Sequence, residues 1–211
     1  MAQSACYSIT TTRPVPEKNG ERSVRLFEIE DTKAFMTALL MRDTFKDFEL
    51  SSGQITTFMT FTLDGFLHDE YLKEDEEQLP GASGSGEDPA SAQSAFAAVN
   101  NKTSEYGAEE ETGLLVPWPV AAPYVTTLIK GKKPPKSMKL VLRLGNAHMK
   151  TMLEKAGSAV AAEQVKGLFL NINYEADKVT CTTGTSMAVF TLDKSVDRVW
   201  DEAVEKFLNH I

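Results

Sequence analysis

The amino-acid sequence predicts an α+β protein in which an antiparallel sheet is covered by about four helices. Apolar and β-branched residues alternate with polar ones in several short runs, which is the pattern of half-buried strands. Near the end of the chain, apolar residues from Val196 to Leu208 recur at every third or fourth position. This spacing predicts a helix that packs on the sheet.

The first half of the chain predicts a strand, a helix and three further strands. Asp31 stands where a helix N-cap is expected, and apolar residues follow it on one helical stripe. Further on, β-branched and aromatic residues alternate up to Asp64-Gly65, the pair favoured in a tight hairpin turn. Met or Phe falls on both faces of that strand, so we expect it to be central. The predicted elements are a strand at 24–29, a helix at 32–42, and strands at 45–50, 55–63 and 66–72.

The second half predicts helices between the strands of a second group. Pro123 suits the first turn of one helix, while Asn146 and Gly157 are suited to begin and end the next. Turns near Asp177 and Gly184 divide a three-strand meander. The predicted helices are at 121–130, 146–157 and 194–210, and the predicted strands are at 138–144, 168–174, 179–183 and 187–192.

The two halves share an order of elements. Residues 24–72 and 138–192 are each predicted as strand, helix, strand, strand, strand. A βαβββ unit repeated twice is the layout of the sliding clamps of DNA replication. The sequence therefore raises the hypothesis of a duplication with clamp-like topology, although a fold by itself does not carry a function.

Charge divides the chain into a folded body and an acidic segment. Residues 69–111 hold twelve of the thirty Asp and Glu but only two Lys, a net charge of −10 against −8 for the whole chain. The segment is also rich in Gly, Ser and Ala, and such a composition does not bury enough apolar surface to offset the entropy of ordering. We predict a flexible tail at 1–22 and a single domain at 23–211, interrupted by a mobile acidic insertion at about 74–112.

Several classes of protein are disfavoured. No apolar run approaches the roughly 20 residues that span a bilayer, and residues 1–22 lack the apolar core of a signal peptide. Cys6 and Cys181 form no disulfide framework, and no metal-binding motif is present. We therefore predict a cytoplasmic protein without a membrane partner, a metal or a cofactor. The oligomeric state stays open.

The most distinctive local feature is a run with five lysines around Gly131 and Pro134-Pro135. We call these five residues the lysine loop: Lys130, Lys132, Lys133, Lys136 and Lys139. They could bind the phosphates of a nucleic acid or nucleotide, or they could be the ordinary surface of a loop after a helix. The loop contains neither Arg for bidentate contacts nor an aromatic residue for base stacking. The acidic insertion could also fold back and mask these lysines.

Two weaker candidates lie elsewhere. Cys181 or Ser186 could be the nucleophile of a hydrolase, but a thiolate needs a nearby His and the sequence places none beside it. Trp118 and Tyr124 could form a patch for a protein partner, although residues of this kind more often return to the core after a mobile loop.

Five runs of the sequence carry a family resemblance. They are Thr56 to Gly65, Leu128 to Pro135, Gly167 to Tyr174, Cys181 to Ser186, and Phe190 to Lys194 with Trp200. Together they resemble a clostridial family of uncharacterised cytoplasmic proteins. The resemblance implies no activity, cofactor or catalytic residue, and it does not extend to the tail or the acidic insertion.

No converging set of acid and base residues is evident, so the leading hypothesis is a binding or interaction protein without a catalytic site. The first alternative is a clamp-like protein that associates with nucleic acid through the lysine loop. The second is a hydrolase that uses Cys181 or Ser186.

Overall fold

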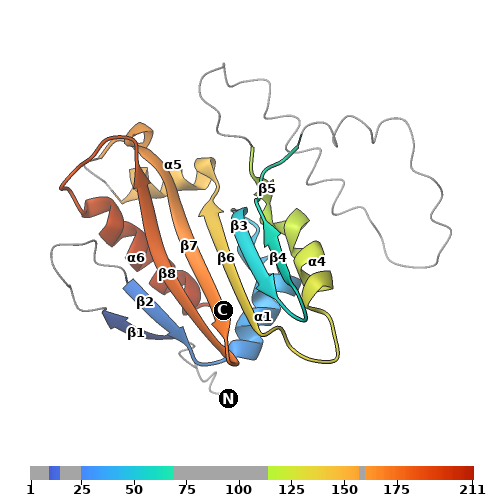
Figure 1. The fold of residues 1–211 in the computed structure, drawn as a ribbon. Coiled ribbons are helices and arrows are strands. Elements are labelled where there is room, and N and C mark those ends of the chain that lie inside the picture. Colours follow the sequence, from blue (N-terminus) through green and yellow to red (C-terminus); the bar gives the residue numbers. More distant parts are fainter. Residues whose placement is uncertain (1–9, 15–24, 69–113, 157–159) are drawn as a thin grey trace, which may run out of the picture.

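The computed structural model describes residues 10–14, 25–68, 114–156 and 160–211 (Figure 1). Within these residues the strands form one antiparallel sheet in the order β1-β2-β8-β7-β6-β3-β4, with β5 paired to β3. The strands are β1 (Thr10–Pro14), β2 (Arg25–Ile29), β3 (Phe48–Thr56), β4 (Thr60–Leu63), β5 (Val116–Pro117), β6 (Ser137–Leu144), β7 (Val165–Glu175) and β8 (Lys178–Met187). The helices are α1 (Thr32–Met41), α4 (Trp118–Ile129), α5 (Asn146–Lys155) and α6 (Ser195–Leu208), with short 3-10 turns at Asp43–Phe45 and Ala162–Gln164. The predicted α+β class is confirmed.

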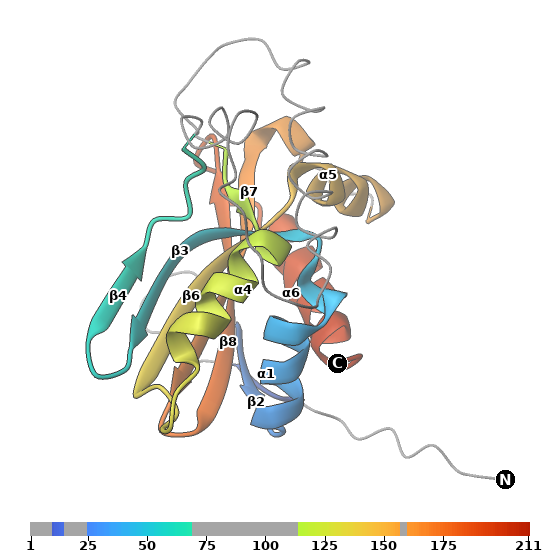
Figure 2. The ribbon, with the colours of Figure 1, turned by 90° about the vertical axis from the view of Figure 1, so that its right-hand side faces the viewer.

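All four described α-helices lie on the same side of the sheet, as the side view in Figure 2 shows. We call this side the covered face and the other the open face. On the covered face, cross-strand partners form apolar rows such as Phe27, Cys181, Ile172 and Leu140, each at most 1% exposed. Because side chains alternate along a strand, the next residue of each strand lies on the open face.

Local signals in the sequence explain where the helices begin. The Asp31 carboxylate accepts a hydrogen bond from the Ala34 N–H at 2.9 Å, so this residue caps α1 as predicted. Helix α4 begins at Trp118, earlier than the prediction, because Pro119 rather than Pro123 occupies its first turn. Gly145 is the N-cap of α5, and the predicted end of this helix at Gly157 lies outside the described residues.

The core is richest in aromatic contacts between α1, the start of β3 and α6. The ring of Phe45 lies 5.8 Å from that of Phe35, 5.6 Å from that of Phe48 and 5.0 Å from that of Phe207. Edge-on and tilted geometries of this kind are favourable for aromatic pairs. The amphipathic pattern of the last helix is confirmed, since α6 buries Val196, Trp200, Val204 and Leu208.

The predicted central strand at 55–63 is wrong. Strand β3 ends at Thr56, the chain reverses through residues 57–59, and β4 returns as an end strand of the sheet. The alternation continued through the turn because Thr, Phe and Met occupy it, so no Gly, Pro or Asn marked the reversal. Asp64-Gly65 still bends the chain, and Gly65 has a φ of 73°. Of the strand predicted at 66–72, residues 66–68 form only an isolated bridge from Phe66 to Leu115, and residues 69–72 lie outside the described residues.

The predicted third strand of the meander is also wrong. Strand β8 passes straight through Gly184 and ends at Met187, and residues 188–194 are neither strand nor helix. The predicted turn near Asp177 is confirmed: Ala176 and Asp177 have positive φ, and the Tyr174 hydroxyl donates to the Asp177 carboxylate at 2.7 Å. Burial, followed by this bond, raises the pKa of Tyr174 to about 12. Without its third strand, the second half does not repeat the βαβββ unit, so the proposed duplication fails.

The N-terminal region differs from the expectation of a flexible tail at one place. Residues 10–14 form strand β1, which pairs with β2 along its whole length. The rest of that region up to residue 24, and the acidic insertion at 74–112, lie outside the described residues.

Candidate anion-binding end of the sheet

The backbone fixes the lysine loop against the turn between β3 and β4. At the end of α4, the Lys130 N–H donates to the Thr126 carbonyl at 2.9 Å. At the other end of the loop, the Lys136 N–H donates to the Thr56 carbonyl at 2.8 Å, and Ser137 pairs with Thr56 in the sheet. The loop is therefore tied to the last residue of β3, eighty positions away in the sequence.

All five side chains of the lysine loop are exposed. Over the described ranges, no carboxylate lies within ion-pair distance of any of them. Residues 130–139 also contain no Asp or Glu, so the loop carries five positive charges without internal compensation. Such a concentration of like charge produces a local potential that attracts anions.

The adjoining turn supplies the aromatic residue that the loop lacks. Phe58 is 91% exposed and Met59 is 49% exposed, and the Thr57 N–H closes the turn on the Met59 carbonyl at 2.9 Å. Figure 1 shows this turn beside the loop between α4 and β6, at the lower end of the sheet. Sequence reasoning missed Phe58 as a candidate because it placed this residue inside a central strand.

Next to the lysine loop, the open face of the sheet carries polar side chains. Lys139 lies between Gln54 of β3 and Asn173 of β7 in the cross-strand register. One row further along, Val141 pairs with Asn171. A shallow hollow of about 330 Å³ lies here, and the residues that line it include Lys139, Val141, Asn171, Asn173 and Glu175.

The two asparagines of the hollow differ in their hydrogen bonding. The Asn171 amide donates to the backbone and side-chain oxygens of Thr182, both at 3.3 Å. The Oδ1 atom of Asn173 is shielded from solvent and accepts no hydrogen bond in the described structure. An unpaired buried acceptor costs about 1–3 kcal/mol, and a donor in the hollow would recover this energy if the Asn173 side chain turned to meet it.

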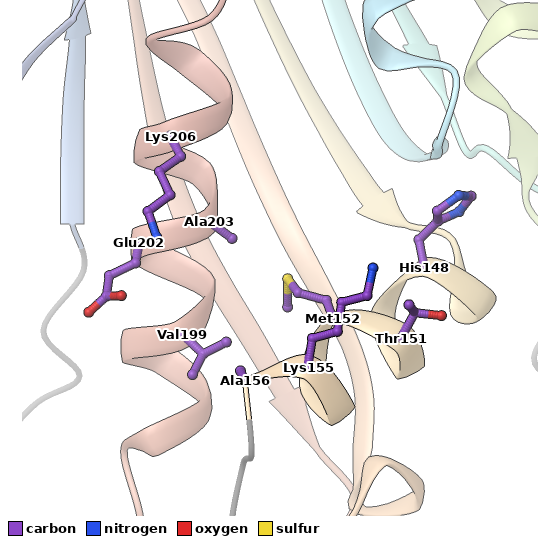
Figure 3. A pocket seen from close by; sticks show the side chains of 9 residues that line it. All are labelled: His148, Thr151, Met152, Lys155, Ala156, Val199, Glu202, Ala203 and Lys206. Atoms are coloured by element: carbon purple, nitrogen blue, oxygen red, sulfur yellow. The ribbon is translucent and has the colours of Figure 1, made fainter.

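A larger groove, of about 600 Å³, lies between α5 and α6 (Figure 3). Met152 of α5 and Val199 and Ala203 of α6 form its apolar part, and Lys155 and Lys206 stand at its sides. His148 lies at the end of the groove nearest the start of α5, and its Nε2 atom is 3.3 Å from an Asp47 carboxylate oxygen. Thr151 has the one hydroxyl among the lining residues, and it donates to the Ala147 carbonyl and not to this histidine.

The hydrolase hypothesis does not fit the position of Cys181. Its side chain is fully buried on the covered face between Phe27 and Ile172, and burial raises the pKa of its thiol. A thiol in this position is neither ionised nor reachable by a substrate. Ser186 is half-buried near the end of β8, and its described surroundings give it no histidine partner.

The predicted partner patch separates into a core residue and a surface residue. Trp118 is 1% exposed, and its indole N–H donates to the Leu39 carbonyl at 2.7 Å. This residue joins α4 to α1, so its assignment to a patch is wrong. Tyr124 is 69% exposed on the outer side of α4 and remains a surface residue.

The described residues contain no group of three or more His, Cys, Asp or Glu side chains placed to hold a metal ion. None of the described helices combines the length and apolar character needed to cross a bilayer.

Comparison with known proteins gives one result. Residues 38–84 and 95–211 match the model of a family of unknown function, DUF5721. No curated protein matches the chain, and no solved structure matches it.

Proposed function

We propose that this chain, which belongs to the DUF5721 family of unknown function, is a non-catalytic binding protein that holds a polyanionic partner at its lysine loop. The observation that carries the proposal is a loop anchored to β3 with five exposed lysines, none of which forms an ion pair with a described residue. A cytoplasmic location and a clostridial origin stay predictions from the sequence.

The chemistry of the loop favours a partner with many negative charges. Each lysine presents a compact ammonium group on a flexible stem, and the loop contains no Arg for planar, bidentate contacts. Attraction of this kind depends on the number of charges more than on their exact placement, and it releases counterions from the partner. Binding should therefore weaken steeply as salt concentration rises.

Two charge-matched double variants of the full chain test the proposal. Lys132→Glu with Lys133→Glu reverses two charges in the loop, and Lys155→Glu with Lys166→Glu reverses two exposed charges on α5 and β7. Labelled heparin and inorganic polyphosphate serve as polyanion probes in fluorescence anisotropy between about 20 and 200 mM salt. We expect the loop variant to lose at least about tenfold in affinity and to flatten the salt dependence, with a much smaller change in the control.

Circular dichroism checks that both variants keep the wild-type fold. Equal losses of affinity in the two variants would mean that overall charge, and not the loop, determines binding. An absence of binding to either probe at about 20 mM salt would reject the proposed function outright.

A further inference from the structure

We propose that the polyanion is a single-stranded nucleic acid, which places phosphates against the lysine loop and bases against Phe58 and the open face. The inference rests on the proposed function, because it assigns the partner class of the same site. Three features of this end of the molecule carry it: an exposed aromatic ring, a row of amide side chains, and an amide oxygen that accepts no hydrogen bond from the described residues.

Phe58 offers a stacking surface beside the charges. Its ring is 91% exposed at the tip of the turn that the Lys136 N–H holds against the loop. Proteins that bind single strands combine a basic groove with aromatic rings on which unpaired bases stack. In a duplex the faces of the bases are already stacked on one another, so this ring favours a single strand.

The open face offers groups that can hydrogen-bond the edges of bases. Gln54 and Asn173 flank Lys139 in the cross-strand register, and each amide carries both donors and an acceptor. None of the described helices covers this face (Figure 2). A strand of nucleic acid that leaves the loop beside Lys139 therefore meets the amide groups of Gln54 and Asn173.

The side-chain oxygen of Asn173 lacks a hydrogen-bond donor among the described residues. Asn173 lines the hollow over β6 and β7, and its Oδ1 atom is shielded from solvent, so a donor on a ligand reaches this atom only when the side chain turns toward the hollow. The exocyclic amino groups of adenine, cytosine and guanine are donors of the kind that this oxygen lacks. An acidic polypeptide would also be attracted by the lysines, but its carboxylates neither donate to this oxygen nor stack on Phe58.

The test compares two exposed phenylalanines of the full chain. Phe58→Ala removes the ring beside the lysine loop, and Phe190→Ala removes an 87% exposed ring at the opposite end of β8, after Met187. The probes are labelled single-stranded DNA and RNA of mixed sequence, a duplex of the same length, and poly-glutamate. Anisotropy is measured for each protein at two salt concentrations.

We expect the wild type to bind the single strands more tightly than the duplex or poly-glutamate. Phe58→Ala should weaken single-strand binding by about 5- to 100-fold with an unchanged salt dependence, while Phe190→Ala should bind as the wild type does. Asn173→Thr should lower affinity for single strands and leave heparin binding unaltered.

The outcomes separate this inference from the proposed function. Binding of heparin and poly-glutamate that equals single-strand binding, or identical affinities of the two Phe variants, would overturn the inference and leave the proposed function standing. Failure of every polyanion to bind would overturn both.

Discussion

The two faces of the sheet differ more than any other two regions of this molecule, although they are made of the same strands. On the covered face, Ile172 and Leu140 pair across β7 and β6 and are at most 1% exposed. At the adjacent position of each strand, Asn173 and Lys139 pair on the open face, and Lys139 is exposed. A step of one residue thus separates positions that stabilise the fold from positions available to a partner.

The largest effect should come from truncating adjacent residues of β6 that lie on opposite faces. Leu142 is fully buried on the covered face, whereas Val141 is half-buried on the open face. We expect Leu142→Ala to lower the free energy of unfolding by about 2–5 kcal/mol, because it leaves a cavity in the core. Val141→Ala should lower it by less than about 1.5 kcal/mol. Urea unfolding followed by circular dichroism measures both, and equal losses would contradict the division between the faces.

A smaller difference in the free energy of unfolding should distinguish the loss of a hydrogen-bonded polar group from the loss of one without a partner. Trp118→Phe removes the donor to the Leu39 carbonyl and leaves that oxygen buried, so we expect a loss of about 1–3 kcal/mol. Asn173→Thr removes an amide oxygen that has no partner among the described residues and introduces a side chain favourable in strands, so the variant should be at least as stable as the wild type. If the asparagine variant proved the less stable of the two, Asn173 would have a structural role that its bonding does not indicate.

The smallest effect concerns a carboxyl group between the covered face and α6. The Thr183 hydroxyl donates to the Asp201 carboxylate at 2.5 Å, and partial burial raises the pKa of Asp201 above its ordinary value of 3.8. The charges that face it are those of Arg25, Asp197 and Glu205. Below pH 3.8 the group is protonated in both the folded and the unfolded state and imposes no cost. As the pH rises through the raised pKa, ionisation in the folded protein lowers its stability.

Asp201→Asn keeps an oxygen that can accept from Thr183 but does not ionise. The variant should therefore gain stability relative to the wild type as the pH rises from 3.8 through the raised pKa, and the difference should then level off. Urea unfolding of both proteins at closely spaced pH values measures this difference. A difference that falls with rising pH would show that the ionised carboxylate is the stabilising form.

Local patterns predicted those parts of the fold whose signals are local. The apolar stripe of α6 and the cap at Asp31 are contained in one segment each, and both predictions are confirmed. The reversal at residues 57–59 was missed because its residues carry no turn signal. The predicted strand at 187–192 had the right composition, but Met187 is the last residue of β8 and residues 188–192 pair with no described strand.

The candidate site shows the same limit. The exposure of the lysine loop followed from its charges and prolines. The place of Phe58 beside it depends on the bond between Lys136 and Thr56, which are eighty residues apart. Pairing over such a distance is set by the topology of the sheet, and no window of the sequence contains it.

The position of Cys181 has a consequence for the study of this protein in solution. Its thiol lies in the middle of the sheet, on a strand held between β2 and β7. A thiol reagent reaches it only when the helices move away from the covered face or the sheet itself opens, so the rate of its modification reports how often this part of the core is exposed. With Cys6 replaced, Cys181 carries the single thiol of the chain, and the rate of its modification measures how often the core opens.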